Sequence, residues 1–185
     1  MAEQAFAAMP AEGELSEAER DYLARVGKWE AANGGYSHIQ ATRPQTLAYG
    51  LNDSPAGLAA WIVEKWREWS DCGGDLDNSF TRDELLTNIT LYWATQTINS
   101  SMRYYYEKRH DPEPAQLKLV ERILTPTAVA VFPAEKELLV PRDWAERSYN
   151  IQRWTEMPRG GHFAALEQPE LLAEDIRAFF RGLRA

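Results

Sequence analysis

The stretch Thr127-Ala-Val-Ala-Val-Phe132 decides the fold class of this chain. It is a short, almost continuous apolar run, which is typical of a strand buried on both faces of a parallel sheet. Ile151 to Met157 predicts a second strand, and Pro141 to Tyr149 predicts a helix between the two. With a last helix from about Pro169, the tail predicts an α/β fold with the order β–loop–α–β–loop–α.

The part of the chain before about residue 125 is expected to be helical. Capping residues and prolines mark the helix starts, at Ser16, Pro44, Ser54 and Thr81. Asn33-Gly34-Gly35 is expected to end the first helix because these residues tolerate positive φ. The last helix of the chain is expected to bury its apolar residues, namely Leu171, Leu172, Ile176, Phe179 and Phe180.

The composition is that of an acidic chain with one cysteine. The 185 residues include 20 Lys+Arg and 28 Asp+Glu, which gives a formal net charge of −8. Because nucleic-acid binding needs a basic face, no nucleic-acid partner is expected. The single Cys72 excludes a disulfide framework, and no apolar run approaches the roughly 18–20 residues of a membrane span. The start from Met1 to Met9 lacks the pattern of a signal peptide, so we expect a cytoplasmic location.

Two loops that follow predicted strands carry the most reactive side chains. Glu135 comes shortly after Phe132, and His162 follows Gly160-Gly161 after the second strand. Ligands of open parallel sheets bind outside the carboxyl ends of the strands, so a site is expected at these loops. A carboxylate beside a histidine fixes the imidazole tautomer and stabilises the imidazolium, as a general base requires. The two glycines permit the unusual backbone that would aim His162 into the site.

A nucleophile to accompany this pair is not evident. No Gly-x-Ser-x-Gly or Gly-x-Asp-x-Gly elbow occurs in the chain. Cys72 lies in a polar loop without the basic neighbour that would favour a thiolate. Asp53 and Asp71 lie in predicted helix-boundary loops.

Four ordered stretches resemble a known family. They are Gly35-Tyr-Ser-His-Ile-Gln-Ala-Thr-Arg-Pro44, Leu51 to Lys65, Ser100-Ser-Met-Arg-Tyr-Tyr-Tyr-Glu107, and the tail from Phe132-Pro-Ala-Glu135 through Arg159-Gly-Gly-His162 to Ile176. Over about residues 14–182 the sequence resembles epoxide hydrolases of the microsomal and juvenile-hormone type, which belong to the α/β-hydrolase superfamily.

The resemblance implies the C-terminal portion of an α/β-hydrolase fold, preceded by a mostly helical lid. Residues 1–124 would form the lid region, and residues 125–185 the last strands and helices of the core. In this family an aspartate opens the epoxide to a covalent ester, while two lid tyrosines donate hydrogen bonds to the epoxide oxygen. A histidine oriented by an acid then activates the water that cleaves the ester, and a vicinal diol is released.

Four residues of this chain match the family's catalytic positions. The lid tyrosines match Tyr36 and Tyr105, the acid matches Glu135, and the base matches His162. Glu137 is an alternative acid. Since neighbouring helical residues point about 100° apart, only one of the three tyrosines at 104–106 is expected to face a given site. His38 and His110 are expected to be structural or exposed, and the stripe of Trp61, Trp66 and Trp69 is expected to be core.

The chain departs from the family pattern because the nucleophile elbow and the oxyanion loop are absent. We therefore expect the C-terminal part of an epoxide hydrolase, from a truncated or split reading frame, or a pseudoenzyme. Alone it is expected to turn over epoxides negligibly. Its expected partners are an epoxide, water and the missing N-terminal half, with no cofactor, metal or membrane.

Two alternatives remain open. One is a half of another α/β-hydrolase, either a haloalkane dehalogenase or an esterase. The tyrosine pair discriminates against a dehalogenase, because a halide leaves without protonation. The other alternative is a non-catalytic helical binding or regulatory module, which would be a stable monomer in solution.

Overall fold

The computed structural model describes residues 15–111 and 122–184. The stretch from Met1 to Met9, for which no signal peptide is expected, lies outside these residues. The chain divides into two compact units, which we call the sheet unit (Met1–Lys28 with Glu113–Ala185) and the helical unit (Trp29–Pro112). Helix α1 (Glu17–Asn33) runs through the boundary. The division into a lid of residues 1–124 and a core of residues 125–185 is a functional one and stays a prediction.

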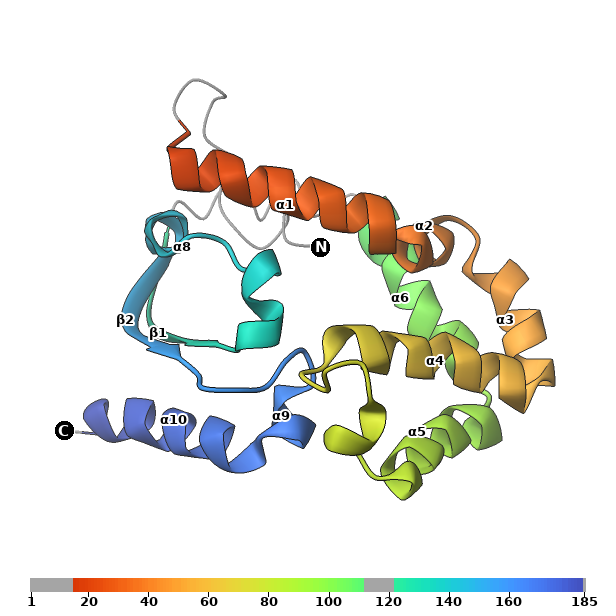
Figure 1. Ribbon diagram of the computed structural model, residues 1–185. Helices are drawn as coiled ribbons and strands as arrows, with labels where there is room; N and C mark the ends of the chain where they lie inside the picture. The colour runs from red at the N-terminus through yellow and green to blue at the C-terminus, as the bar shows by residue number, and fades with distance from the viewer. Residues whose placement is uncertain (1–14, 112–121, 185) are drawn as a thin grey trace. The chain divides into compact units, whose positions relative to one another are not determined.

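The helical unit is built from six elements in sequence (Figure 1). They are α2 (Gly35–Thr42), α3 (Pro44–Asp53), α4 (Pro55–Trp69), η3 (Leu76–Asn78), α5 (Arg82–Thr95) and α6 (Ile98–His110). The capping residues predicted from the sequence begin two of them. Ser54 Oγ accepts from the N–H of Gly57 at 3.0 Å, and Thr81 forms a capping box with Glu84. Buried apolar side chains from these helices form one core, namely Ala48, Leu51, Leu58, Ile89, Ile98 and Met102.

The end of α1 differs from its prediction. The helix ends at Asn33, as expected, but Gly34 has a φ of −72° and α2 begins at Gly35, so neither glycine uses the positive-φ region. A glycine is needed at position 34 because the backbone of Glu30 lies close to it. A Cβ atom at position 34 would lie 2.5 Å from the carbonyl oxygen of Glu30. Gly34 therefore lets α2 follow α1 directly where any side chain would collide with the preceding turn.

The sheet unit contains the predicted α/β pattern. Strands β1 (Ile123–Val131) and β2 (Tyr149–Glu156) pair in parallel from Ile123 opposite Tyr149 to Val131 opposite Glu156. Parallel strands need a crossover, which η4 (Pro133–Leu138) and α8 (Arg142–Ser148) provide. After β2 come α9 (Ala164–Glu167) and α10 (Pro169–Gly182), and α10 runs beside the sheet in Figure 1.

The expected burial of this unit is wrong in two places. Most of β1 is half-buried or exposed, and only Val131 and the adjoining Phe132 are buried. None of the five apolar residues predicted to be buried by α10 is buried, and Ile176 and Phe180 are 47% and 51% exposed. The physical reason is the small number of strands in the sheet. Within the described residues the sheet has two strands, which leave apolar surface that a larger sheet would cover.

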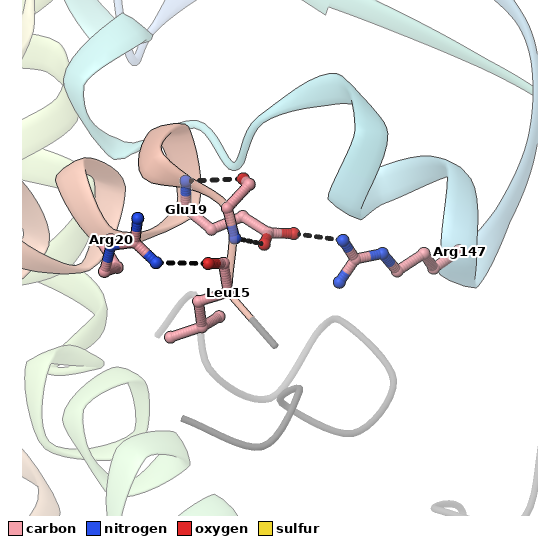
Figure 2. A network of polar contacts seen from close by, with 5 residues as sticks. Leu15, Glu19, Arg20 and Arg147 are labelled. Carbon is pink, nitrogen blue, oxygen red and sulfur yellow. Dashed lines mark hydrogen bonds and ion pairs between the residues drawn. The ribbon is translucent and has the colours of Figure 1, made fainter. Parts of the chain in front are cut away.

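A buried carboxylate joins the start of α1 to α8 within the sheet unit (Figure 2). Glu19 is 1% exposed, and its Oε1 lies 2.6 Å from Nη2 of Arg147. The predicted capping box is also present, since the N–H of Ser16 donates to Glu19 Oε2 at 2.7 Å and Ser16 Oγ accepts from the N–H of Glu19 at 3.3 Å. Arg20 donates to the carbonyl oxygen of Leu15. One side chain therefore both caps α1 and pairs with α8.

Replacing Arg147 with Met tests this contact. The buried Glu19 carboxylate would lose its guanidinium, so we expect the free energy of unfolding to fall by about 1–3 kcal/mol. Arg142→Met is the matched control, because Arg142 starts the same helix and pairs with Glu146 at 2.7 Å while being 53% exposed. An exposed pair contributes about 1 kcal/mol or less. Urea denaturation at fixed pH measures both variants, and equal losses would contradict the role of Glu19.

Candidate active site

Glu135 and His162 come together at the carboxyl ends of the two strands. Glu135 lies in η4, directly after β1, and His162 lies in the turn that follows β2. The N–H of Met157 donates to the carbonyl oxygen of Val131 at 2.8 Å, which continues the strand pairing to the edge of the site. His162 Nδ1 lies 2.9 Å from Glu135 Oε1, and the side chains are 43% and 30% exposed. The structure thus brings the predicted acid and the predicted base within hydrogen-bond distance.

Gly160 sets the path of the turn that carries His162. Its φ is +108°, a region that favours glycine. A Cβ at this position would lie 2.7 Å from Cδ1 of Phe132 and 3.0 Å from Cγ of Gln168. The carbonyl oxygen of Gly160 accepts from the N–H of Ala134 at 3.2 Å, which ties the turn to the first residues of η4. The two loops that present the acid and the base are therefore connected through backbone as well as side chains.

Glu135 influences both the protonation and the tautomer of the His162 imidazole. The hydrogen bond to Glu135 raises the pKa of His162, and the charges of Glu135 and Glu167 add to this increase, while partial burial opposes it. In the neutral ring, an Nδ1–H that donates to Glu135 leaves Nε2 as the proton acceptor. This arrangement can take a proton from a water molecule and stabilise the imidazolium that results.

The pair lies in the wall of a largely apolar pocket of about 240 Å³ in the sheet unit. The lining residues are Ala130, Val131, Phe132, Glu135, Leu139, Gly161, His162 and Ala164. Apolar walls with a few polar groups are the usual composition of a small-molecule site. Glu137, the alternative acid, lies in η4, but its side chain is outside the described part of the chain, so the choice between the two acids stays open.

In the helical unit, the two tyrosines assigned by resemblance contact each other. Tyr36 on α2 and Tyr105 on α6 have ring centroids 6.0 Å apart and planes at 80°. Burial raises the pKa of the Tyr105 hydroxyl, and hydrogen bonds with Gln40 and Tyr36 partly oppose the increase. Tyr105 therefore stays protonated at neutral pH and retains an O–H to donate. Gln40 is buried on α2, one helical turn after Tyr36.

The neighbours of Tyr105 point elsewhere. Tyr104 is 63% exposed, and the ring of Tyr106 stacks on His110 with centroids 4.1 Å apart. Tyr105 alone among these three tyrosines contacts Tyr36 in the described side chains, as the helical spacing predicts. His38 and His110 are exposed, in agreement with expectation.

Tyr36 is further held by α4. Its ring lies 5.1 Å from that of Trp69, and Nζ of Lys65 lies 5.1 Å from its centroid. The tryptophan stripe thus has two roles, because Trp66 packs on Phe80 in the interior while Trp69 supports Tyr36. A cation over a phenol ring is attracted to its π face, so Lys65 helps to hold the ring of Tyr36 in place.

Sequence reasoning missed four residues around these two pairs. They are Gln40, Lys65, Trp69 as a support for Tyr36, and Glu167. Gln40 follows Tyr36 by four residues, so helical spacing carried a usable signal. The contact of Lys65 depends on the packing of α4 against α2, and no local pattern indicates it. Within residues 15–111 and 122–184, no three His, Cys, Asp or Glu side chains converge as metal ligands would.

Comparisons with known proteins point to one group. The sequence is 46% identical over 152 residues to epoxide hydrolase 1 of Sus scrofa, covering 78% of this chain and 33% of the relative. It is 47% identical over 151 residues to juvenile hormone epoxide hydrolase 2 of Ctenocephalides felis, covering 77% and 32%. The chain therefore spans about a third of the length of these relatives. No model of a known protein family matches it.

Solved structures agree with the sequence matches. The chain resembles the juvenile hormone epoxide hydrolase of the silkworm Bombyx mori with a TM-score of 0.78 and 34% identity, covering 92% of this chain and 43% of the other. It resembles the epoxide hydrolase of Aspergillus niger with a TM-score of 0.73 and 32% identity, covering 94% and 42%. In the described part of the chain, no helix is both long and apolar enough to cross a bilayer.

Replacing Glu135 with Gln tests the electrostatics of the site through stability. Because folding raises the pKa of His162, the folded chain binds this proton more tightly than the unfolded chain does. The resulting stabilisation is complete below the unfolded value of about 6.5 and is lost as pH rises through the folded value. We expect the free energy of unfolding to fall across this window more in the wild type than in Glu135→Gln.

Urea denaturation at closely spaced pH values measures this difference. Glu170→Gln, at the exposed start of α10, is the control for loss of one negative charge. Parallel pH curves for the wild type and Glu135→Gln would show that the 2.9 Å contact has no electrostatic effect in solution.

Proposed function

We propose that this chain, which corresponds to part of an epoxide hydrolase of the α/β-hydrolase fold, supplies the two tyrosines and the acid–histidine pair that convert an epoxide to a vicinal diol. The single observation that carries the proposal is the hydrogen bond between His162 Nδ1 and Glu135 Oε1 in an apolar pocket. The aspartate nucleophile belongs to the remainder of the protein, because the chain spans about a third of its relatives and contains no glycine-flanked elbow.

In the first step, the aspartate carboxylate attacks an epoxide carbon and forms an ester as the carbon–oxygen bond breaks. The oxygen that leaves carries negative charge, and Tyr36 and Tyr105 donate hydrogen bonds to it. Preformed donors aimed at developing charge lower the barrier because they need no reorganisation during the reaction. The half-buried Tyr105 hydroxyl, which hydrogen-bonds with Gln40 and Tyr36, is protonated at neutral pH and can donate in this step.

In the second step, His162 Nε2 takes a proton from water as the water oxygen attacks the ester carbonyl. The ester carbon–oxygen bond then breaks, and the departing oxygen takes the proton held by the imidazolium. The second proton of the water passes from the new carboxyl group, through solvent, to the oxygen released in the first step, so the diol is complete and the aspartate carboxylate is restored. Glu135 stabilises the imidazolium between these proton transfers. Glu137 remains the alternative acid for this role.

The tyrosine pair favours an epoxide over the other hydrolase reactions. A halide leaves without a proton, so a dehalogenase gains little from two phenol donors. The contact between Tyr36 and Tyr105 over 6.0 Å therefore supports epoxide opening rather than dehalogenation. An acidic composition with a single, buried cysteine supports a cytoplasmic location as part of the same proposal.

The partner we propose is the remainder of the hydrolase core. Apolar residues of the sheet unit lie open to solvent, with Leu124 of β1 75% exposed and Phe180 of α10 51% exposed. Strand edges and apolar faces of this kind associate when left uncovered. A non-catalytic helical module would instead give a stable monomer, and light scattering of the pure chain separates the two readings.

Reconstitution with the missing half tests the proposal directly. We expect co-expression with a fragment that carries a Gly-x-Asp-x-Gly elbow to restore diol formation. His162→Ala should lower turnover by about 10²–10⁴-fold, because general-base assistance to water is lost. The covalent ester should then accumulate on the fragment, which intact-mass spectrometry detects. His38→Ala, in an exposed position on α2, is the matched control. Full turnover in His162→Ala would overturn the base assignment.

The tyrosine role has its own variant pair in the same assay. Tyr105→Phe removes one donor, so we expect ester formation to slow by up to about 10²-fold. Tyr104→Phe removes the hydroxyl of the adjacent, 63% exposed tyrosine and should leave the rate unchanged. Equal rates for the two variants would contradict the assignment of Tyr105.

A further inference from the structure

Glu167 forms a reciprocal pair of hydrogen bonds with the residue that follows His162. The N–H of Phe163 donates to Glu167 Oε1 at 2.9 Å, and the N–H of Glu167 donates to the carbonyl oxygen of Phe163 at 2.9 Å. Glu167 ends the short helix α9 and is only 9% exposed. A carboxylate is costly to bury unless hydrogen bonds compensate for lost hydration. The Glu167 carboxylate is therefore fixed by hydrogen bonding to the backbone of Phe163, next to His162.

The next residue secures the same turn from the other end. Gln168 Oε1 accepts from Nε of Arg159 at 2.6 Å, and its Cγ limits the space at Gly160. The segment from Arg159 to Phe163 is thus held at both ends by consecutive side chains that follow it in the chain. Glu167 is the charged member of this arrangement, and it fixes the peptide unit next to His162.

Two carboxylates act on His162 from different elements. Glu135 on η4 bonds directly to Nδ1, and Glu167 on α9 is anchored to the adjacent backbone. Both charges raise the pKa of His162, and the direct bond to Glu135 has the larger effect. Arg159, the nearest cation along the turn, is engaged with Gln168.

We propose that Glu167 is a positioning residue for His162: its buried carboxylate fixes the turn that carries the imidazole and places a second negative charge beside the ring. This role rests on the proposed function, in which His162 is the base. Glu135 sets the tautomer through Nδ1, while Glu167 acts through the backbone and through space. The imidazolium that forms during ester hydrolysis is then stabilised by two acids rather than one.

NMR titration of the histidine ring protons in the full chain tests the proposal. The chain has three histidines, so the His162 signal is assigned by its loss in His162→Gln. Glu167→Gln keeps an oxygen that can accept from the N–H of Phe163 but removes the charge. We expect the His162 midpoint to move to lower pH in Glu167→Gln, by less than in Glu135→Gln. Glu170→Gln, three residues further along the chain, is the matched control and should leave the midpoint in place.

A merely structural role gives a different pattern. It would leave the midpoint of His162 in Glu167→Gln equal to that of the wild type, and this result would overturn the proposal. Glu167→Ala removes both the charge and the acceptor, so we expect the same shift with a lower melting temperature. If that variant fails to fold, Glu167→Gln alone decides.

The reconstituted enzyme separates this proposal from the proposed function. If the wild-type pair forms no diol but the midpoint still shifts in Glu167→Gln, the proposed function fails and the action of Glu167 on His162 stands. If diol forms and the midpoint does not shift, the proposed function stands and the positioning role fails. When both hold, the acidic limb of the pH–rate profile should move to lower pH in Glu167→Gln.

Discussion

The parallel pairing of β1 and β2 is the constraint on which the candidate site depends. Because the two strands run in the same direction, their carboxyl ends meet at one edge, and the residues that follow them meet there too. Glu135 and His162 are 27 residues apart in the chain and 2.9 Å apart in space. Gly160 is also needed for this meeting. Its backbone turns sharply against Phe132 and brings His162 back to the strand ends. An antiparallel pairing would separate the acid from the histidine.

Local signals in the sequence predicted the helix starts and the strand order. Ser16, Ser54 and Thr81 cap as expected, because capping depends on residues within one turn. The pairing of Glu135 with His162 was also predictable, since the rule of strand ends needs only the order of elements. The role of Gly34 was not, because it comes from an atom of Glu30 that only the folded turn brings close.

Long-range packing accounts for the remaining failures. The apolar residues of α10 follow a helical stripe that looks like core, yet stripes report which face is apolar and not what covers it. Lys65 reaches Tyr36 from another helix, so its contact depends on how α4 packs and not on any local motif. Glu167 was visible as an acid shortly after His162, but its importance follows from the backbone hydrogen bond and its burial.

The contact between Glu19 and Arg147 has a consequence for how the chain folds. The two residues are separated by the whole helical unit, so the sheet unit is assembled from discontinuous segments. During synthesis, all residues of the helical unit are made before those of β1, because Trp29–Pro112 precede Ile123–Val131 in the chain. Glu19 on α1 lacks its guanidinium partner until Arg147 on α8 has been synthesised. The sheet unit can therefore be completed only after Arg147 of α8 has been synthesised, 128 positions after Glu19 in the chain.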